Sequence, residues 1–262
     1  MEEKRRNWDR EETILAMDLY CRTPFNKISK SNSEIILLAG KLKRTPSAVS
    51  KKMFNLAHYD PDLAARNVTA LAHTSKLDQI IFEEFYQDMQ ELSYQAGIIK
   101  ESLDIKETNT EIEKIKKEVM EIIPSGGYRE RETKVRIGQY YFRKSVLTSY
   151  GNKCCITGLA IPALLVASHI KPWAVSNDKT EKTNPANALC LNPFHDKAFD
   201  RGFITINEKY EIVVSSRLEK TNMDENTKTW FTSYKGKQIT LPDKFNPSKE
   251  FIEYHNDMIF IP

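Results

Sequence analysis

The sequence has 262 residues, of which 40% are hydrophobic and 29% are charged, and a formal net charge of +3 at pH 7. This composition excludes a largely disordered chain and leaves room for two modest domains. No apolar run is long enough to span a bilayer, and the charged start MEEKRRNWDREE lacks the apolar core of a secretory signal, so we expect a cytoplasmic protein. The net charge is too small to indicate a nucleic-acid partner by itself.

Residues 8–60 predict three short helices. Asp9 is suited to cap the first, and the stretch Ser31–Ser33 can cap the second, SEIILLAGKLK. The triplet Thr45-Pro46-Ser47 begins the third, because proline is tolerated in a first helical turn. One side of this third helix is apolar, and the other side is expected to face solvent with Ser47, Lys51 and Lys52.

Three helices whose last follows a tight turn and carries basic groups resemble a helix-turn-helix of the Myb or homeodomain-like type. The phrase KRTPSAVSKKM is similar to the turn and recognition helix of such modules. The resemblance implies a DNA-binding module over residues 1–62, with phosphate contacts from Arg44, Lys51 and Lys52. A small helical bundle that contacts protein would show the same pattern, so both interpretations stay open.

Residues 63–127 predict a helical connector. The segment 76–96 has apolar residues at helical spacing and predicts one amphipathic helix. Farther on, branched apolar residues recur at intervals of seven in two series, first Ile105, Ile112 and Val119, and then Ile115 and Ile122. This seam is typical of a short coiled coil, either in a homodimer or in a linker helix packed on its own domain. The break at Pro124–Gly127 predicts a domain boundary.

The stretch 128–153 is rich in basic and aromatic residues, which suits a phosphate-contacting surface, although a solvated face would show the same charges. The chain has four cysteines, Cys21, Cys154, Cys155 and Cys190. They form no CxxC pair, so we expect packed thiols rather than a zinc knuckle.

Downstream of residue 153, short apolar runs alternate with polar turns. Leu164–Ala167 predicts a strand that leads into Ser168 and His169, and Ala188–Leu191 predicts a second strand. Residues 194–200 are expected to form a helical turn, after which Gly202 permits a turn into the strand FITI.

The motifs ASHIKPW, NALCL and FHDKAFDRGFITI, in this order and spacing, resemble the HNH nuclease family. The resemblance extends to the flanking phrases YFRKSVLTSYGNKCCITG and NPSKEFIEYHNDMIF, and it covers about residues 136–262. It implies an α+β chain whose C-terminal domain, residues 128–262, has the ββα-metal fold, in which a two-stranded hairpin and a helix grip one divalent ion.

The resemblance also implies roles for single residues. His169 corresponds to the general base, Asn187 to the asparagine that pins the loop, and His195 to a metal ligand. An imidazole, with an unperturbed pKa near 6.5, suits the deprotonation of water near neutral pH. The ion would be Mg²⁺, with Mn²⁺ or another transition ion left open.

One position departs from the family pattern. The residue before the base is frequently an acidic or histidine ligand in such nucleases, whereas here it is Ser168, a poor ligand. Asp196 or Asp200 is therefore the expected source of the missing carboxylate. Two nearby cations, Lys171 and Arg201, are expected to contact phosphates, although solvated charges would look the same.

The sequence thus predicts a metal-dependent endonuclease that cleaves double-stranded DNA to a 5′-phosphate and a 3′-hydroxyl. Analogy with the family suggests a restriction-like or phage-defence role. The alternative is a DNA-binding regulator whose HNH-like domain is catalytically silent, for which Ser168 is the best support. We expect His255, in the tail motif, to serve packing rather than catalysis.

Overall fold

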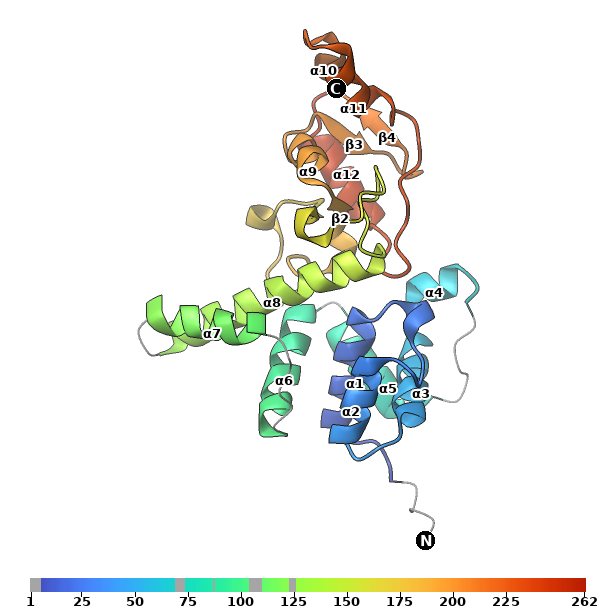
Figure 1. Cartoon of the computed structure of the whole chain (residues 1–262), viewed down its shortest axis with the longest axis vertical. Helices are drawn as coiled ribbons and strands as arrows, with labels where there is room; N and C mark the ends of the chain where they lie inside the picture. The colour runs from blue at the N-terminus through green and yellow to red at the C-terminus, as the bar shows by residue number, and fades with distance from the viewer. Residues whose placement is uncertain (1–5, 69–73, 87, 104–109, 123–125) are drawn as a thin grey trace. The chain divides into compact units, whose positions relative to one another are not determined.

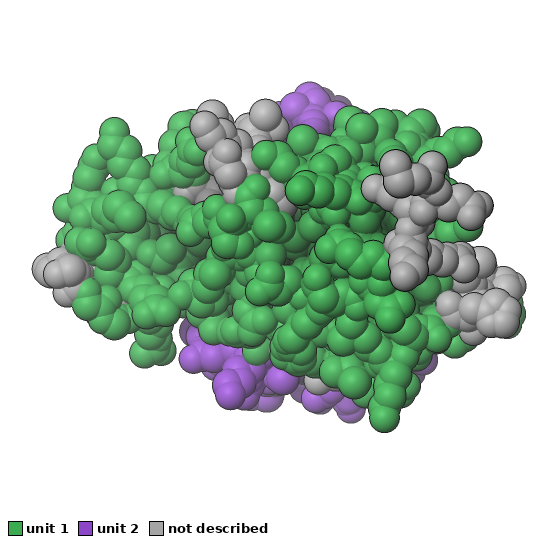
Figure 2. Space-filling model, turned by 90° about the horizontal axis from the view of Figure 1, so that it is seen from below, with its two compact units in different colours: residues 1–142 green, residues 143–262 purple. Residues whose placement is uncertain are grey.

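The structure is a computed structural model that describes residues 6–68, 74–86, 88–103, 110–122 and 126–262. The chain divides into two compact units, residues 1–142 and 143–262, which Figure 2 shows in different colours. The division lies within one continuous helix, α8 (Gly127–Ser149), and not at the glycine-containing break before it, where a boundary was predicted. Among the described helices, none has both the length and the apolarity that a bilayer crossing requires.

The described part of unit 1 is helical (Figure 1). Its elements are α1 (Arg10–Arg22), the 3-10 turn η1 (Phe25–Lys27), α2 (Ser33–Lys41), α3 (Pro46–Ala57), α4 (Pro61–Ala65), α5 (Lys76–Phe85), α6 (Met89–Ser102), α7 (Thr110–Ile122) and the first part of α8. The first three α-helices lie where the sequence predicts them. Asp9 accepts a hydrogen bond from the Glu12 amide (2.9 Å), and Thr45 Oγ1 accepts one from the Ala48 amide (3.1 Å), so local capping fixes where α1 and α3 begin.

The segment 76–96 forms two helices instead of the single predicted one. The carboxylate of Asp88 accepts a hydrogen bond from the Glu91 amide (2.9 Å) and thereby caps a new helix, α6. Apolar residues on both sides of the break are buried, since Phe85 is 0% exposed and Met89 is 4% exposed. The apolar periodicity therefore continues across the break and does not reveal it.

The predicted heptad seam is described only in part. Ile105 lies outside the described residues, and so does the side chain of Ile112. Val119 is fully buried within the chain itself, whereas Ile122 is 69% exposed. The chain itself thus already covers Val119, and the homodimer has no support from this helix.

Unit 2 contains two small antiparallel sheets, β1–β2 and β3–β4, and confirms the expected α+β class. Its elements are η2 (Pro162–Leu164), β1 (Val166–His169), η3 (Trp173–Val175), η4 (Pro185–Asn187), β2 (Ala188–Leu191), α9 (Pro193–Asp200), β3 (Ile204–Ile206), β4 (Ile212–Val214), α10 (Ser216–Lys220), α11 (Glu225–Thr232) and α12 (Lys249–Met258). The second strand has its predicted bounds. The first starts two residues late, because a 3-10 turn precedes it.

The hairpin β1–β2 carries His169 at its end, opposite Ala188. All four residues of β2 are 0% exposed, so this strand forms the centre of the unit's core. Asn192 caps the following helix, α9, by accepting hydrogen bonds from the amides of Phe194 and His195 (both 3.0 Å). The hairpin and α9 are therefore joined by a single capping residue, which fixes where the helix starts relative to the strands.

Gly202 makes the turn from α9 into β3. Its φ of +71° favours glycine, and a Cβ at this position would lie 2.1 Å from the Ile259 carbonyl oxygen. The Ile261 amide donates to the Gly202 carbonyl oxygen (3.0 Å), so the C-terminal segment lies directly on the turn. A side chain here would push that segment away from the end of α9.

The four cysteines are buried free thiols, as predicted. Burial raises the pKa of Cys190 to about 12 and raises that of Cys155 as well. Both thiols therefore stay protonated near neutral pH and serve as small apolar core residues.

Candidate active site

A groove of about 550 Å³ lies between the end of β1, the exposed side of α9 and the C-terminal helix α12. Six polar or ionisable residues that could take part in a reaction line this groove, namely Ser168, His169, Asp196, Asp200, Arg201 and His255. These residues come from three segments that are up to 87 positions apart in the chain, and they include the predicted base and both carboxylates.

The imidazole of His169 has a defined tautomer. Its Nε2 lies 2.8 Å from the Lys182 carbonyl oxygen, and since a carbonyl oxygen can only accept, Nε2 carries the proton and Nδ1 is the basic atom. The ring of Trp173 packs edge-on against the imidazole at 5.6 Å and limits its rotation. Burial lowers the pKa of His169, which the bond to Lys182 opposes in part. The histidine is therefore neutral and able to take a proton at pH 7.

Asn187 is fully buried and ties the loop between β1 and β2 together. Its Nδ2 donates to the carbonyl oxygens of Lys171 (3.1 Å) and Glu181 (3.2 Å), and its Oδ1 accepts from the Lys171 amide (2.8 Å). Lys182, which holds the His169 ring, directly follows Glu181. Asn187 thus fixes the loop segment that carries the hydrogen-bond partner of His169.

Asp196 and Asp200 lie four residues apart on α9 and so share one face of the helix. Burial raises the pKa of Asp200, and the negative charge of Asp196 raises it further. Two carboxylates that repel each other in a groove are suited to bind a cation.

The residues of the groove fit a hydrated Mg²⁺ better than a closed metal cage. In the part of the chain that the structure describes, no group of three or more His, Cys, Asp or Glu side chains could hold a metal ion. Mg²⁺ needs no such group, because it commonly binds through one or two carboxylates and keeps several waters. Ser168 Oγ is buried and lacks a hydrogen-bond partner among the described residues. Buried polar atoms usually have such a partner, so this oxygen is left unsatisfied.

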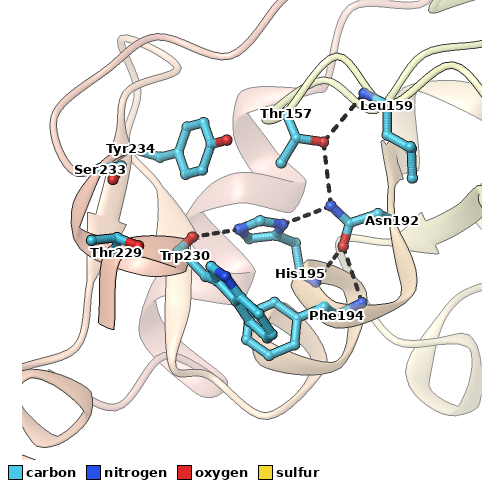
Figure 3. A pocket seen from close by; sticks show the side chains of 9 residues that line it. All are labelled: Thr157, Leu159, Asn192, Phe194, His195, Thr229, Trp230, Ser233 and Tyr234. Atoms are coloured by element: carbon cyan, nitrogen blue, oxygen red, sulfur yellow. Dashed lines mark hydrogen bonds between the residues drawn. The ribbon is translucent and has the colours of Figure 1, made fainter. Parts of the chain in front are cut away.

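His195 is not in this groove, contrary to expectation. Its Nδ1 lies 2.8 Å from Asn192 Nδ2, and its Nε2 lies 3.0 Å from the Trp230 carbonyl oxygen (Figure 3). The side chain of Asn192 donates to Nδ1, and Nε2 donates to the carbonyl oxygen. Both ring nitrogens are therefore used within the protein, and a metal ion could bind only after one of these bonds is broken. The histidine links α9 to α11.

The two predicted phosphate-binding cations of unit 2 differ in their surroundings. Lys171 forms an ion pair with Glu181 (2.7 Å) and lies over the Tyr254 ring at 5.3 Å, so its charge is already used in holding the loop. Arg201 is exposed and lines the groove next to Asp200. Of the two, Arg201 is in the better position to contact a substrate phosphate.

Most of the basic residues of unit 1 that were predicted to contact DNA are already paired with acidic side chains of the same chain. Lys52 was expected to face solvent, but it is 3% exposed and forms an ion pair with Asp78. Arg44 pairs with Glu12 (2.6 Å) and stacks on the Trp8 ring at 4.2 Å. These partners lie in segments far along the chain, so the helical pattern of α3 could not reveal them. The third residue, Lys51, is exposed.

His255 lies at the wall of the groove and serves packing. Its Nε2 donates to the Phe199 carbonyl oxygen (3.1 Å), and its ring stacks on that of Phe199 at 3.8 Å. It is 1% exposed, and burial lowers its pKa to about 4. No signal in the sequence other than the tail motif pointed to this contact.

Acidification should destabilise unit 2 through His255. In the unfolded chain this histidine titrates near 6.5, so between pH 6.5 and 4 the unfolded chain binds more protons than the folded one. The contribution of neutral His255 to the free energy of unfolding is therefore complete above pH 6.5. It is lost as the pH falls towards 4, by up to about 3 kcal/mol. Urea unfolding at pH 7 and pH 4.5 measures this loss. His255→Gln should show a smaller loss than the wild type, and an equal loss in both proteins would contradict the assignment.

The family model of HNH endonucleases matches residues 154–207. The match covers about a fifth of the chain and includes β1, β2, α9 and β3, that is, the hairpin and helix that line the groove. Nucleases of this family generally use a divalent metal ion. A search of curated proteins finds no match to the chain. The predicted resemblance to HNH endonucleases is thus supported over residues 154–207, whereas the helix-turn-helix resemblance of residues 1–62 stays a prediction.

Proposed function

We propose that the chain is an endonuclease that hydrolyses DNA with the help of one divalent cation. The observation that carries this proposal is the groove in which His169, with its proton fixed on Nε2, lies together with the carboxylates of Asp196 and Asp200. The HNH endonuclease match over the same residues supports nuclease activity.

His169 Nδ1 takes a proton from the attacking water. The new bond forms between the water oxygen and phosphorus, and the bond from phosphorus to the 3′-oxygen breaks. The leaving 3′-oxygen takes a proton from solvent water, which leaves a 5′-phosphate and a 3′-hydroxyl. Arg201, which lines the groove, attracts the phosphate. Asn187 holds in place the loop that positions His169.

Asp196 and Asp200 would hold the cation, with Ser168 Oγ as a weak third oxygen. When bound, a divalent cation offsets the negative charge that develops on the phosphate and on the leaving oxygen. We assign this role to the two aspartates and not to His195, because the ring nitrogens of His195 are both bonded within the protein.

Incubation of supercoiled plasmid with the full-length protein tests the proposal. Nicked product is expected with Mg²⁺ or Mn²⁺ and is expected to vanish with EDTA. One site cuts one strand, so linear product requires two copies of the protein acting on opposite strands. Intact plasmid with every divalent metal tried, alongside retained DNA binding, would favour the alternative of a DNA-binding regulator with a silent HNH-like domain.

The physiological setting that we propose is restriction or phage defence, by analogy with the HNH family. In that setting, cleavage should depend on the origin of the DNA. Plasmid with the modification pattern of the source cells should resist cleavage, and unmodified plasmid should be cut. Equal cleavage of both would leave an endonuclease without this role.

The proposal for unit 1 is that α3 contacts DNA through its exposed lysine, Lys51. Lys51→Ala should weaken duplex binding and reduce the slope of log affinity against log salt by about one unit. Lys30→Ala is a matched control, since Lys30 is an exposed lysine outside α3. Fluorescence anisotropy at several salt concentrations measures both slopes, and equal slopes would favour a protein-interaction module. Lys52 is left intact because its ion pair with Asp78 belongs to the fold.

A further inference from the structure

A second pocket of unit 2, of about 740 Å³, borders the N-terminal turn of α9 (Figure 3). Three aromatic side chains line it, Phe194 from α9, Trp230 from α11 and Tyr234 just after α11. Trp230 and Tyr234 lie outside the residues of the HNH match, 154–207, and none of the three rings lines the groove.

The rings of this aromatic pocket are held in place by their neighbours. The bond from His195 Nε2 to the Trp230 carbonyl oxygen ties α11 to α9, and His195 itself is 4% exposed. The Phe194 and Trp230 rings meet edge to face, with centroids 4.7 Å apart, and Tyr234 meets the His195 ring at 5.6 Å. The pocket is thus preformed and does not need a ligand to order it.

Large parts of these rings are exposed despite this packing. Trp230 is 51% exposed and Phe194 is 37% exposed, which leaves two adjoining aromatic surfaces in contact with water. Adjoining exposed apolar surfaces of this kind mark binding sites more often than isolated exposed residues do. Burying one face of a flat ring against them would remove apolar area from water on both partners.

Polar groups at the edge of the pocket suit a flat heterocycle better than an aliphatic ligand. Within the described residues, neither the Tyr234 hydroxyl nor the Trp230 indole N–H has a hydrogen-bond partner. In Figure 3 the Tyr234 hydroxyl points across the pocket towards Thr157. A ligand that stacks on the rings can therefore exchange hydrogen bonds at its edge, as a nucleobase does.

The pocket and the catalytic groove share helix α9. Phe194 lines the pocket and Asp200 lines the groove, with a rise of about 9 Å between them along the helix axis. Six residues also turn the helix by about 240°, so the two side chains point to different sides of α9. A strand whose phosphate lies at the carboxylates would pass round α9 to place a base a few nucleotides away in the pocket.

We propose that the aromatic pocket binds a nucleobase of the cleaved strand, taken out of the base stack, through stacking on Trp230 with an edge of the base against Phe194. This inference rests on the proposed endonuclease function, because that function supplies the strand. The pocket would hold the strand in register with the groove, so that one phosphate is presented to His169.

The test uses the protein with His169→Ala, which is expected to bind DNA without cutting it. One probe is a labelled twelve-residue oligothymidylate, and the other is an abasic chain with the same number of phosphates. Trp230→Ala should weaken binding of the oligothymidylate by about 5- to 100-fold, because stacking of one base on an aromatic ring contributes that much. Binding of the abasic chain should stay within about twofold, since the phosphate contacts are unchanged.

Trp230→Phe keeps a ring and should retain most of the affinity, which separates a loss of stacking from a loss of folding. Equal binding of oligothymidylate by the parent and Trp230→Ala would overturn the proposal. So would an equal loss for both probes, which would indicate a backbone contact or a folding defect. Plasmid nicking by the protein with His169 intact is measured separately. If Trp230→Ala weakens oligothymidylate binding but no nicking occurs, the endonuclease proposal is refuted and the pocket proposal stands. If nicking occurs but the binding does not depend on Trp230, the pocket proposal is refuted and the endonuclease proposal stands.

Discussion

Replacement of His169 by alanine should lower the rate of DNA cleavage by about 10²- to 10⁴-fold, the usual contribution of a general base. The reason lies in the geometry of the groove, where the Lys182 carbonyl oxygen fixes the proton on Nε2 and so makes Nδ1 the basic nitrogen. Alanine removes the base and leaves both carboxylates in place. Initial rates of plasmid nicking at saturating Mg²⁺ measure the effect.

DNA binding separates this prediction from a defect in folding. His169→Ala should bind duplex DNA as the wild type does, because no phosphate contact is lost. His58→Ala is a matched control, since His58 is an exposed histidine of unit 1, and it should cleave at the wild-type rate. Nearly normal cleavage by His169→Ala would show that another group activates the water.

The pH dependence of cleavage adds an independent check on the base. Burial lowers the pKa of His169, so the histidine stays neutral to a lower pH than an exposed imidazole. The acid limb of the rate profile should therefore fall below pH 6.5, the unperturbed value. An acid limb above that value would point to a different base.

The second large effect should come from the carboxylates of α9. Asp196→Asn and Asp200→Asn should each raise the Mg²⁺ concentration needed for half-maximal nicking by about 10- to 100-fold or more, since loss of even an outer-shell partner costs that much metal affinity. The pair shares one helix face in the groove, and a cation between or beside the two groups would offset their mutual repulsion.

His195→Gln provides the matched control for this prediction. Glutamine can keep a bond to the Trp230 carbonyl oxygen, and the substitution should lower the thermal stability of unit 2 without changing the Mg²⁺ requirement. A change of the Mg²⁺ requirement in His195→Gln as large as that in Asp196→Asn would make His195 a ligand after all. The contrast between these two neighbouring residues thus decides which side of α9 binds the cation.

Local features of the sequence were enough to predict most of the elements around the site. The apolar run Ala188–Leu191 forms a strand with the predicted bounds, and the caps Asp9 and Thr45 begin helices where expected. Such signals act between residues only a few positions apart, so they can be recognised in the sequence without knowledge of the fold. The order of the HNH motifs also placed His169 at the end of the first strand, because strand, loop and helix follow one another directly.

The tertiary structure decided what each charged or polar side chain is used for. His195 is bonded to Trp230, 35 positions away, and this contact takes it out of the groove that the motif assigned to it. Lys52 is bonded to Asp78, 26 positions away, and becomes a buried ion pair instead of a DNA contact. Both outcomes depend on which distant segment packs against the helix, and neither the helical period nor the residue type carries that information. The sequence therefore predicted the strands, the helix and the candidate base, whereas packing between distant segments decided that Asp196 and Asp200, and not His195, line the same groove as His169.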